Sequence, residues 1–597
     1  MRLFRRRTTS SHGKDSTMAY ASRDSDPRQA LTGAAAPQGE ITVGARIADF
    51  LHNEQIDHIF SICDVTYNQI HKRAVEIGIE IVAPRHEAAG VHMADALSRM
   101  TGRPQVVMAG MGPGVANLVP GVVCANIENI PVIVITTQRT RSTHSAVRRG
   151  RFQYTPQLRM FEPITKWSAS VDGAKRIDEI LREAFRQATS GRPEPVYVEV
   201  PSDVMLETRA FPALTNAESY RLAPQACAEA PIQAAATLLA EAQLPMILAG
   251  TGVHTSRAHR ELRRLAELLH CPVTGTPGGR GTLPATHPLW FQMVGIEGSL
   301  ATQADCVLAI GSSVGEPIDF GEAPSFAGAE HQCWIQIERD PTAIGVNRRV
   351  DVPLVGDLRV VLPQLIAALE KRGPFEARPQ ASEYIRRQRE SFAAVRRALP
   401  DTSPIHPGRA FREVRQVLPD DAVLALDGGS TGLWESIGNE QRSNDFLWTS
   451  KFGHLGVGFP YAIAAQIAVG PQRRVCLVTG DSAFGFYTME LETAVRHNLP
   501  VLVVVNGDQH WGMEYEGQLA EIGRHVECGT SPVRLDRLAQ SLGAHGEYVT
   551  KTDEIGPAVE RALASGKPAV VHIVTDAIAN ANPPGLDDFD TWYAGDY

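Results

Sequence analysis

The stretch VCLVTGDSAFGFYTMELETAVRHNLPVLVVVNGDQHWG, residues 475 to 512, decides the fold of the region around it. Two apolar runs rich in β-branched residues, VCLVTG and PVLVVV, enclose the helical pattern MELETAVRHN. That order is typical of parallel strands joined by a covering helix. An aspartate follows each run, Asp481 after the first and Asp508 after the second. Because the carboxyl ends of parallel strands meet at one edge of a sheet, the pair indicates a functional site at that edge.

Similar apolar runs alternate with amphipathic helical patterns through most of the chain. They include IEIVAP, PQVVMAG, PVIVITT, PVYVEV, PMILAG, DCVLAIG, CWIQIE, DAVLALD and AVVHIV. Pro-rich polar segments interrupt the alternation and read as linkers, at 209–231 and 371–400. We therefore expect an α/β protein of three doubly wound parallel-sheet domains, which occupy 41–208, 232–370 and 401–576.

The two ends of the chain differ from the rest. Residues 1–40 are rich in Arg, Ser, Thr and Ala without hydrophobic periodicity, so we expect a disordered N-terminal extension. Its Arg-rich start weakly resembles an organelle transit peptide, but a plain extension upstream of Met18 is favoured. Residues 577–597 are acidic, aromatic and aperiodic. They form either a C-terminal tail that closes over the active site as a lid or a frayed end.

Composition excludes several classes of partner. The 597 residues contain no apolar run near the ~20 residues that a membrane span needs, so no membrane role is expected. The net charge is -9 and no basic stripe is interleaved with aromatics, which argues against nucleic acid. The eight cysteines have no C-x-x-C spacing, and several lie in apolar runs. We expect them to be reduced core residues of a cytoplasmic protein.

The quoted stretch also suggests a ligand. Gly480 allows a tight turn between a strand and a helix N-terminus, whose free N–H groups suit a phosphate. An aspartate there would repel a phosphate unless a cation lay between them. Asp481 and Asp508 supply the hard oxygen ligands that Mg²⁺ prefers. The competing interpretation makes Asp481 a helix N-cap and Asp508 a turn residue.

The succession GDS, ELETA, NLPVLVVV and NGDQHWG resembles the thiamine diphosphate signature of a superfamily of enzymes. The superfamily contains acetolactate synthases, 2-ketoacid decarboxylases, oxalyl-CoA decarboxylase and 2-hydroxyacyl-CoA lyase. Its second metal ligand lies 27 positions beyond the motif aspartate, which is the spacing from Asp481 to Asp508. The resemblance implies Mg²⁺ held by these two carboxylates and by the main-chain carbonyl of His510. Gly507 departs from the usual asparagine and removes one hydrogen-bonding amide.

The same resemblance implies the positions of the cofactor contacts. The diphosphate would lie on the turn formed by Gly480, Ser482 and Ala483. LALDGGSTGLW matches the strand and loop that hold the diphosphate, so Ser430 and Thr431 are candidate donors. The usual Gln/His pair of the synthases is absent there.

Two further blocks resemble the family. APRHEAAGVHMADALSRMTGRP, followed by the turn at 112–114, matches the N-terminal block and makes Glu87 the carboxyl that binds N1′ of the aminopyrimidine. Without the resemblance, Glu87 would be an ordinary first-turn helix acid. SKFGHLGVGFPYAIAAQIAVG matches the segment in which the Gly453 carbonyl binds the 4′-amino group and Leu455 bends the cofactor. A core aliphatic is the alternative for Leu455.

The resemblance implies a pyrimidine-binding, a middle and a diphosphate-binding domain. Glu87 of one subunit would reach a cofactor held by another, so a homodimer is the minimum and a homotetramer is common. In the middle domain, GTGVHTS and the region of Arg280 are candidate contacts for ADP or FAD, although a lone Gly-rich turn is a weak signal.

The substrate is less well defined than the cofactor. GDSAFGF followed by ME, ET, R and NLPV is closest to the form of oxalyl-CoA decarboxylase and 2-hydroxyacyl-CoA lyase. We therefore expect a carbon–carbon lyase that cleaves a small 2-hydroxyacyl-CoA into formyl-CoA and an aldehyde or ketone. The alternatives are an acetolactate synthase-like carboligase, a 2-ketoacid or oxalyl-CoA decarboxylase, and a non-catalytic homologue.

Candidate substrate-facing residues come from three loops. Val65 lies in IFSICDVTYNQI, where the family has a Gly-Ile-Pro turn. Phe152 and Gln153 lie in GRFQYTPQ, which leans towards the synthases. Trp511 lies in the loop that contains Asp508, and Glu514 lies six residues beyond Asp508, where pyruvate decarboxylases carry an active-site glutamate. Glu514 is the candidate for handling the substrate hydroxyl proton; alternatively, it is a solvent-facing helix residue.

Overall fold

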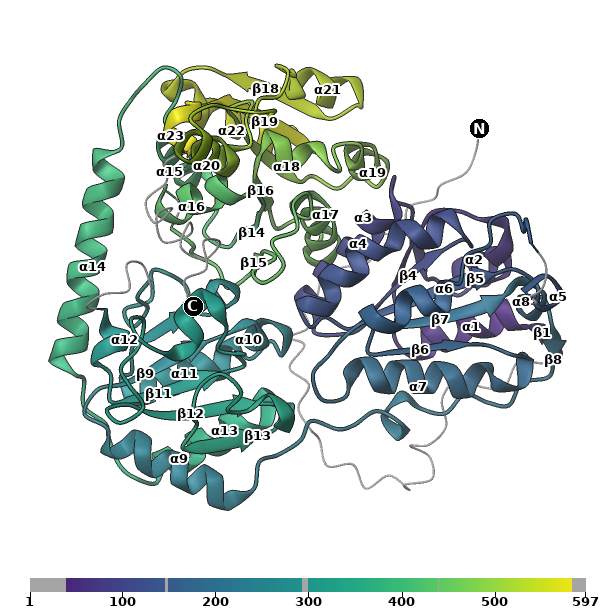
Figure 1. Ribbon diagram of the computed structural model, residues 1–597, viewed down its shortest axis with the longest axis horizontal. Helices are drawn as coiled ribbons and strands as arrows, with labels where there is room; N and C mark the ends of the chain where they lie inside the picture. The colour runs from purple at the N-terminus through teal and green to yellow at the C-terminus, as the bar shows by residue number, and fades with distance from the viewer. Residues whose placement is uncertain (1–38, 145–148, 293–298, 439, 582–597) are drawn as a thin grey trace, which may run out of the picture.

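The computed structural model describes residues 39–144, 149–292, 299–438 and 440–581. These form three domains, each a parallel sheet covered by helices (Figure 1). The predicted fold class is thereby confirmed. The predicted extension lies outside the described residues except for its last two positions, and so do residues 582–597 of the predicted tail. Within the described ranges, none of the helices has the length and apolar character needed to cross a bilayer.

The N-terminal domain has a six-stranded sheet in the order β3-β2-β4-β5-β7-β6. Its strands are β2 (His58–Ser61), β3 (Glu80–Val82), β4 (Gln105–Ala109), β5 (Val132–Gln138), β6 (Trp167–Ser170) and β7 (Val196–Pro201). Its helices are α1 (Val43–Asn53), α2 (Asn68–Glu76), α3 (Glu87–Thr101), α4 (Pro113–Ile127), α5 (Arg141–His144), α6 (Gln157–Phe161), α7 (Ile177–Thr189) and α8 (Ser202–Met205). Short β1 (Ile41–Thr42) and β8 (Thr208–Arg209) pair antiparallel. All residues of β5 are buried, as expected for a central strand covered on both faces.

The middle domain has a five-stranded sheet in the order β10-β9-β11-β12-β13. Its strands are β9 (Pro245–Ala249), β10 (Val273–Gly275), β11 (Cys306–Ile310), β12 (Cys333–Glu338) and β13 (Val352–Val355). Its helices are α9 (Glu229–Glu241), α10 (Thr251–Thr255), α11 (His259–Leu269), α12 (Leu300–Gln303) and α13 (Leu358–Glu370). Of the eight cysteines of the chain, six are buried, while Cys63 is exposed and Cys333 half-buried. The expected core position is therefore wrong for Cys63.

The C-terminal domain has a six-stranded sheet in the order β15-β14-β16-β17-β19-β18. Its strands are β14 (Val423–Leu426), β15 (Phe446–Leu447), β16 (Val475–Gly480), β17 (Leu502–Gly507), β18 (His545–Val549) and β19 (Ala569–Val574). Its helices are α15 (Pro407–Val417), α16 (Gly429–Gly438), α17 (Gly458–Val469), α18 (Asp481–Gly485), α19 (Glu490–Arg496), α20 (Gly512–Ile522), α21 (Leu535–Ser541), α22 (Thr552–Ala564) and α23 (Ala577–Ala581). The last of these lies within the predicted tail.

The N-terminal and C-terminal sheets share one strand order: second, first, third, fourth, sixth, fifth. In open parallel sheets, ligands bind where the order reverses, between the first and third strands. That position lies between β2 and β4 in one domain and between β14 and β16 in the other. In the middle domain it lies between β9 and β11. The topology therefore gives each domain one preferred binding crevice.

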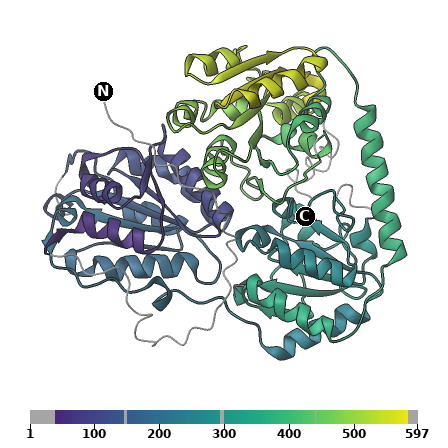
Figure 2. The ribbon, with the colours of Figure 1, turned by 180° about the vertical axis from the view of Figure 1, so that it is seen from behind.

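The linker predicted over 371–400 is mostly a helix, α14 (Pro379–Ala398). It runs along the outside of the middle and C-terminal domains in both views (Figures 1 and 2). Ala381 and Ile385 anchor it in an apolar cluster of the middle domain. The Pro-rich composition concealed the helix because Pro379 occupies its first turn, where the missing N–H costs nothing.

Helix α3 packs on helix α17 and joins the N-terminal domain to the C-terminal domain (Figure 1). Arg99 lies buried in this contact. Its guanidinium donates to Asp95 at 2.6 Å and to the hydroxyl of Tyr461 at 3.3 Å, and lies 3.6 Å from a carboxylate oxygen of Glu128. Asp95, Arg99 and Glu128 all belong to the N-terminal domain, so the contact that crosses to α17 is that of Arg99 with the hydroxyl and ring of Tyr461. Because a buried donor left without its acceptor is costly, this contact favours one packing of the two helices.

The middle domain is joined to the C-terminal domain by ion pairs. Arg280 lies 2.7 Å from Glu435 on α16. Asp445 lies 2.8 Å from Arg257 of the middle domain and 2.5 Å from Arg473. Arg280, a candidate nucleotide contact from sequence, is therefore engaged in holding two domains together.

Two histidines stabilise the position of Arg280. His254 donates through Nε2 to the carbonyl of Arg280 at 2.8 Å, so its Nδ1 accepts from Nε2 of His259 at 3.0 Å. Burial lowers the pKa of His254 to about 4 and that of His259 to about 3. Both rings are therefore neutral at pH 7.

These pKa values predict the acid sensitivity of the fold. The folded-state values lie below the unfolded value of about 6.5, so the unfolded chain takes up protons first as the pH falls. The free energy of unfolding should therefore fall from pH 6.5 towards pH 4. His254→Asn should make this fall shallower, because Asn can still donate to the Arg280 carbonyl but does not titrate. Thermal unfolding at several pH values measures the slope.

The matched control is His331→Gln, because His331 is 77% exposed in the same domain. It should leave the slope unchanged. If the free energy of unfolding fell with pH as steeply in His254→Asn as in the parent protein, His254 would not be a source of the acid sensitivity.

Candidate functional site

The two strand-end aspartates lie together in the C-terminal domain. Asp481 begins α18 after β16, and Asp508 follows the neighbouring parallel strand β17. Asp481 accepts the N–H of Gln509 at 2.7 Å. The hydroxyl of Ser482 donates to the carbonyl of His510 at 3.2 Å. The structure thus gathers the three predicted metal ligands, while their role as ligands stays a prediction.

The surroundings of Asp481 and Asp508 disfavour the charged forms of both carboxylates. Burial, with the nearby charge of Asp508, raises the pKa of Asp481 to about 6. Burial also raises the pKa of Asp508. A divalent cation between them would remove the repulsion. Among the described residues no group of three or more His, Cys, Asp or Glu side chains converges, so two carboxylates and a main-chain carbonyl are the available donor set.

Unpartnered polar atoms surround this pair. Ser430 Oγ, Asn506 Oδ1 and Asn580 Oδ1 are buried and have no hydrogen-bond partner among the residues that the structure describes. The amide of Asn580 donates to Asp508 at 2.6 Å. A Cβ placed on Gly512 would lie 3.0 Å from the Asn580 amide nitrogen and 3.0 Å from the Ser430 hydroxyl, so both side chains lie beside Gly512. Because buried polar atoms seldom lack partners, these three indicate a ligand: the Ser430 hydroxyl can donate to a diphosphate oxygen, and the two amide oxygens can accept from the water shell of its Mg²⁺.

The other predicted diphosphate contacts lie around the same turn. The hydroxyl of Thr431 accepts from the amide of Asn506 at 3.2 Å. A Cβ on Gly480 would lie 3.2 Å from this hydroxyl, so glycine keeps the turn open. Ala483 is buried in α18. The structure therefore places Ser430, Thr431 and the Gly480 turn at the crevice between β14 and β16.

Asp427, which the sequence analysis overlooked, holds the loop predicted to bind the aminopyrimidine. Its carboxylate accepts the N–H groups of Gly456 at 3.3 Å and Gly458 at 3.0 Å. Burial raises its pKa to about 7. Gly453, with a φ of +61°, and half-buried Leu455 lie in this loop. The signal was present in the sequence, because Asp427 follows a strand as Asp481 and Asp508 do.

The glycine at 507 has a steric reason. A Cβ there would lie 2.2 Å from Nε2 of His572 on β19, so the histidine ring occupies the space of a side chain. The amide of Asn580 on α23 reaches Asp508 instead. A residue from the predicted tail thus supplies the amide that the sequence analysis found missing.

Glu87 begins α3 at the edge of the N-terminal sheet. Nδ1 of His86 accepts the N–H of Ala88 at 3.1 Å and caps the helix. The amide of Asn117 on α4 donates to the Glu87 carboxylate at 2.9 Å. A Cβ on Gly114 would lie 3.1 Å from that carboxylate, so the 112–114 turn leaves room for it. Glu87 stays partly exposed beside the crevice between β2 and β4.

The loop after β2 is built around an aspartate. Asp64 accepts the N–H of Thr66 at 2.8 Å. A Cβ on Gly110 would lie 2.0 Å from the other oxygen of Asp64, so the carboxylate enters the crevice against a glycine. Val65 is 82% exposed at the same turn.

The remaining predicted substrate residues lie on two domains. Phe152 is 73% exposed, and the carbonyl of Gln153 packs against Gly112 in the N-terminal domain. Trp511 lies 6.2 Å from the Phe486 ring, centroid to centroid, in the C-terminal domain. Glu514 is exposed in the first turn of α20. The candidate site therefore consists of two groups of residues, one on the N-terminal domain and one on the C-terminal domain.

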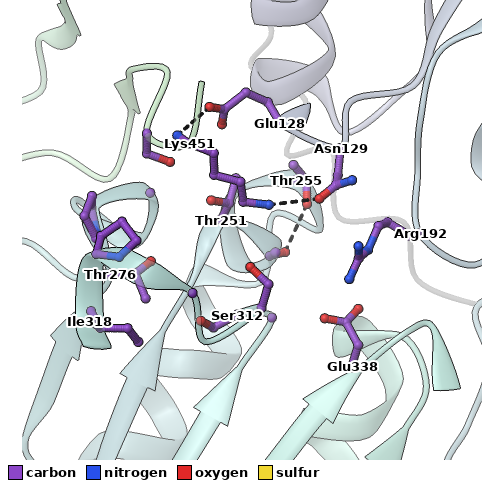
Figure 3. A pocket seen from close by; sticks show the side chains of 18 of the residues that line it. Glu128, Asn129, Arg192, Thr251, Thr255, Thr276, Ser312, Ile318, Glu338 and Lys451 are labelled. Carbon is purple, nitrogen blue, oxygen red and sulfur yellow. Dashed lines mark hydrogen bonds between the residues drawn. The ribbon is translucent and has the colours of Figure 1, made fainter. Parts of the chain in front are cut away.

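A cavity lies at the crevice of the middle sheet (Figure 3). Thr251 follows β9 and Ser312 follows β11, and both line it. Lys451 borders it from the C-terminal domain. Figure 3 shows Arg192 and Glu338 facing each other across its mouth. The lining combines apolar surface with hydroxyl groups and with side chains of both signs of charge.

Three comparisons with family models cover most of the described chain. The thiamine pyrophosphate enzyme N-terminal domain matches residues 41–160, the central domain residues 232–365 and the C-terminal domain residues 427–573.

Curated relatives span nearly the same length. The "Probable acetolactate synthase large subunit" of Methanocaldococcus jannaschii is 33% identical over 83% of this chain and 85% of its own. "Sulfoacetaldehyde acetyltransferase" of Alcaligenes xylosoxydans xylosoxydans is 30% identical over 83% and 87%. "2-hydroxyacyl-CoA lyase 1" of Mus musculus is 29% identical over 89% and 93%.

Asp481→Ala tests the metal site. Removing an outer partner of a metal site typically costs about 10- to 100-fold in metal affinity, so loss of a direct carboxylate should cost at least about 100-fold. Titration of the protein with thiamine diphosphate at fixed Mg²⁺, followed by tryptophan fluorescence, measures the loss.

Asp553→Asn is the matched control, since Asp553 is an exposed first-turn acid of α22. It should bind the cofactor as the parent does. Unaltered binding in Asp481→Ala would restore the reading of Asp481 as a simple helix-start residue.

Proposed function

The chain belongs to the thiamine pyrophosphate enzymes, and on this premise we propose that it is a Mg²⁺-dependent lyase acting on a 2-hydroxyacyl-CoA. The cofactor assignment rests on one observation. The carboxylates of Asp481 and Asp508 lie close together, beside three buried polar atoms that have no partner among the described residues. Asp481, Asp508 and the His510 carbonyl would hold Mg²⁺. The Gly480 turn with Ser430 and Thr431 would hold the diphosphate.

The bound cofactor would supply a nucleophilic carbon that adds to a carbonyl carbon of the substrate, and a ring that accepts the electron pair of the adjacent C–C bond as it breaks. The protein contributes the proton chemistry. Glu87 would share a proton with N1′ of the aminopyrimidine, while the Gly453 carbonyl accepts from its 4′-amino group. Asp427 fixes the loop that presents Gly453, through two main-chain hydrogen bonds.

Two copies of the chain would complete each site. On α3, His92, Asp95 and Arg99 face the C-terminal domain of the same chain. At about 100° per residue, Glu87 lies roughly 110° around the helix from that face. Val65, in the turn after β2, and Phe152, next to the Gln153 that packs against Gly112, are both exposed, and they suit a contact with the diphosphate-binding domain of a second copy. A homodimer is the smallest assembly with complete sites, and a homotetramer would pair two of them.

In the proposed reaction the C1–C2 bond of the substrate breaks. The hydroxyl at C2 loses its proton and becomes the carbonyl of an aldehyde or ketone, and C1 takes up a proton and leaves as formyl-CoA. Glu514 is the proposed acceptor of the hydroxyl proton, supported by its exposed position on the first turn of α20, six residues beyond Asp508. The mouse relative is named for this substrate class.

A second candidate is a carboligase or decarboxylase of 2-ketoacids. Relatives named acetolactate synthase, at 33% and 31% identity, favour it. Phe152 and Gln153 also lean towards that branch.

The middle-domain cavity is the proposed place for a nucleotide such as ADP. Lys451 and Arg192 could face its phosphates, and the glycine turns at 250–252 and 311–313 let a ligand approach the backbone.

Product analysis by mass spectrometry tests the substrate. The protein, loaded with Mg²⁺ and thiamine diphosphate, is given a panel of 2-hydroxyacyl-CoA thioesters in one reaction and pyruvate with other 2-ketoacids in another. We expect formyl-CoA and a carbonyl compound from the first. Glu87→Gln is the control and should abolish turnover while it leaves the metal ligands in place. Turnover confined to the 2-ketoacids would replace the lyase by the second candidate.

A further inference from the structure

Two buried glutamates cross the boundary between the N-terminal and C-terminal domains. Glu490 begins α19 in the C-terminal domain, and one of its oxygens accepts the N–H groups of residues 85 and 86 at 2.8 and 3.2 Å. Glu128 follows α4 in the N-terminal domain, and one of its oxygens accepts the N–H groups of residues 451 and 452 at 2.7 and 3.2 Å. Each carboxylate therefore holds two consecutive main-chain amides of the opposite domain.

The amides in question lie next to the proposed cofactor contacts. Residues 85 and 86 form the turn that leads directly into Glu87. Residues 451 and 452 directly precede Gly453. A small rotation of either turn would move the proposed contact, because the next main-chain unit carries it.

The carboxylates of Glu490 and Glu128 are both buried. Each residue is 1% exposed. The second oxygen of Glu490 accepts from the hydroxyl of Thr493 at 2.7 Å. The second oxygen of Glu128 lies 3.6 Å from the guanidinium of Arg99. Hydrogen bonds from main-chain amides to a carboxylate are stronger than neutral ones, and a buried amide left without its acceptor is costly.

Other contacts to the same turn are at the surface. Arg496 donates to the carbonyl of Ala83 at 2.6 Å, and Arg85 lies 3.9 Å from Glu492. Arg85 is 54% exposed and Glu492 34% exposed, so their pair contributes little. Within the described part of the chain, Glu490 is the side chain that accepts the amides of this turn from the buried side.

We infer that Glu490 and Glu128 are positioning residues, in which Glu490 sets the orientation of Glu87 and Glu128 sets that of the Gly453 carbonyl before the cofactor binds. This inference rests on the proposed function in one respect, because it takes Glu87 and Gly453 as contacts of the aminopyrimidine. The clamps themselves exist in the protein without the cofactor.

Amide hydrogen exchange of the full-length, cofactor-free protein tests the clamps directly. Glu490→Ala should speed exchange at residues 85 and 86 by about 10- to 100-fold, the effect of losing a charged acceptor. Glu128→Ala should do the same at residues 451 and 452. Glu490→Gln should exchange at nearly the parent rate, because its remaining oxygen can accept both amides.

The second readout is made on the loaded protein. Exchange of the C2 proton of bound thiamine diphosphate with deuterium, followed by NMR, should slow at least about tenfold in Glu490→Ala, since a misplaced acid loses proton-transfer efficiency. Glu490→Gln should restore it. The dissociation constant of the cofactor should change little in both variants, because Asp481 and Asp508 are intact.

Glu492→Ala is the matched control, with the same change of residue on the same helix but no amide contact. It should leave both readouts at parent values. If Glu490→Ala fails to fold, Thr493→Val removes one support of Glu490 and should shift both readouts in the same direction by a smaller factor.

Parent-like exchange at residues 85 and 86 in Glu490→Ala would overturn the clamp. A slowed C2 exchange that Gln fails to restore would overturn the positioning role, since it would separate the effect from the amide contacts. A protein that binds no thiamine diphosphate would refute the proposed function instead, and the amide exchange would still decide on the clamp.

Discussion

The packing of α3 against α17 is the contact on which both halves of the candidate site depend. Arg99 is held on α3 by Asp95 and lies close to Glu128, and it crosses to the C-terminal domain by donating to the Tyr461 hydroxyl on α17 and to the Trp448 carbonyl, each at 3.3 Å. A buried guanidinium that loses its acceptors is costly, so these two hydrogen bonds favour one packing of α3 on α17. The α3 helix carries Glu87 at its start, and the loop before α17 carries Gly453. One interface therefore sets the orientation of an element from each half.

Because the N-terminal and C-terminal domains share one strand order, each of them provides one half of the candidate site. Each outer domain places a crevice between its first and third strands, and each crevice receives an acid from a strand end. In the C-terminal domain the acids are Asp427 and Asp481, with Asp508 from the next strand, and the cluster suits a cation and a diphosphate. In the N-terminal domain Asp64 and Glu87 lie beside glycine turns and suit a polar ring. The proposed contacts of the cofactor would thus be divided between two domains of the same strand order.

The sequence was sufficient for the features that depend on local pattern. Strand ends with acids, β-branched runs and glycine turns predict the three domains and the place of Asp481 and Asp508 at one sheet edge, because each signal lies within a few residues. Glu87 was predicted only through the family resemblance, since by itself it reads as an ordinary first-turn helix acid. Glu490 could not be found in this way, since the amides it holds lie 405 and 404 positions away and its surroundings read as an ordinary helix start. The helix α14 was hidden by Pro379 in its first turn and by the proline that precedes it at position 374. Asn580 lies in a segment without periodicity, and the packing of α23 against α20 and α16 brings it to Asp508.

Subunit complementation tests most directly whether the two halves meet between two copies of the chain. Glu87→Gln and Asp481→Ala chains, carrying different affinity tags, are co-expressed, and the mixed assembly is purified through both tags. C2-proton exchange of bound thiamine diphosphate is then measured, so that no substrate need be known. If each site takes Glu87 from one chain and Asp481 from the other, mixed dimers contain one intact site and exchange returns, although both parent variants are inactive. If the mixed assembly stays as inactive as its parents, each site lies within a single chain and the account is wrong.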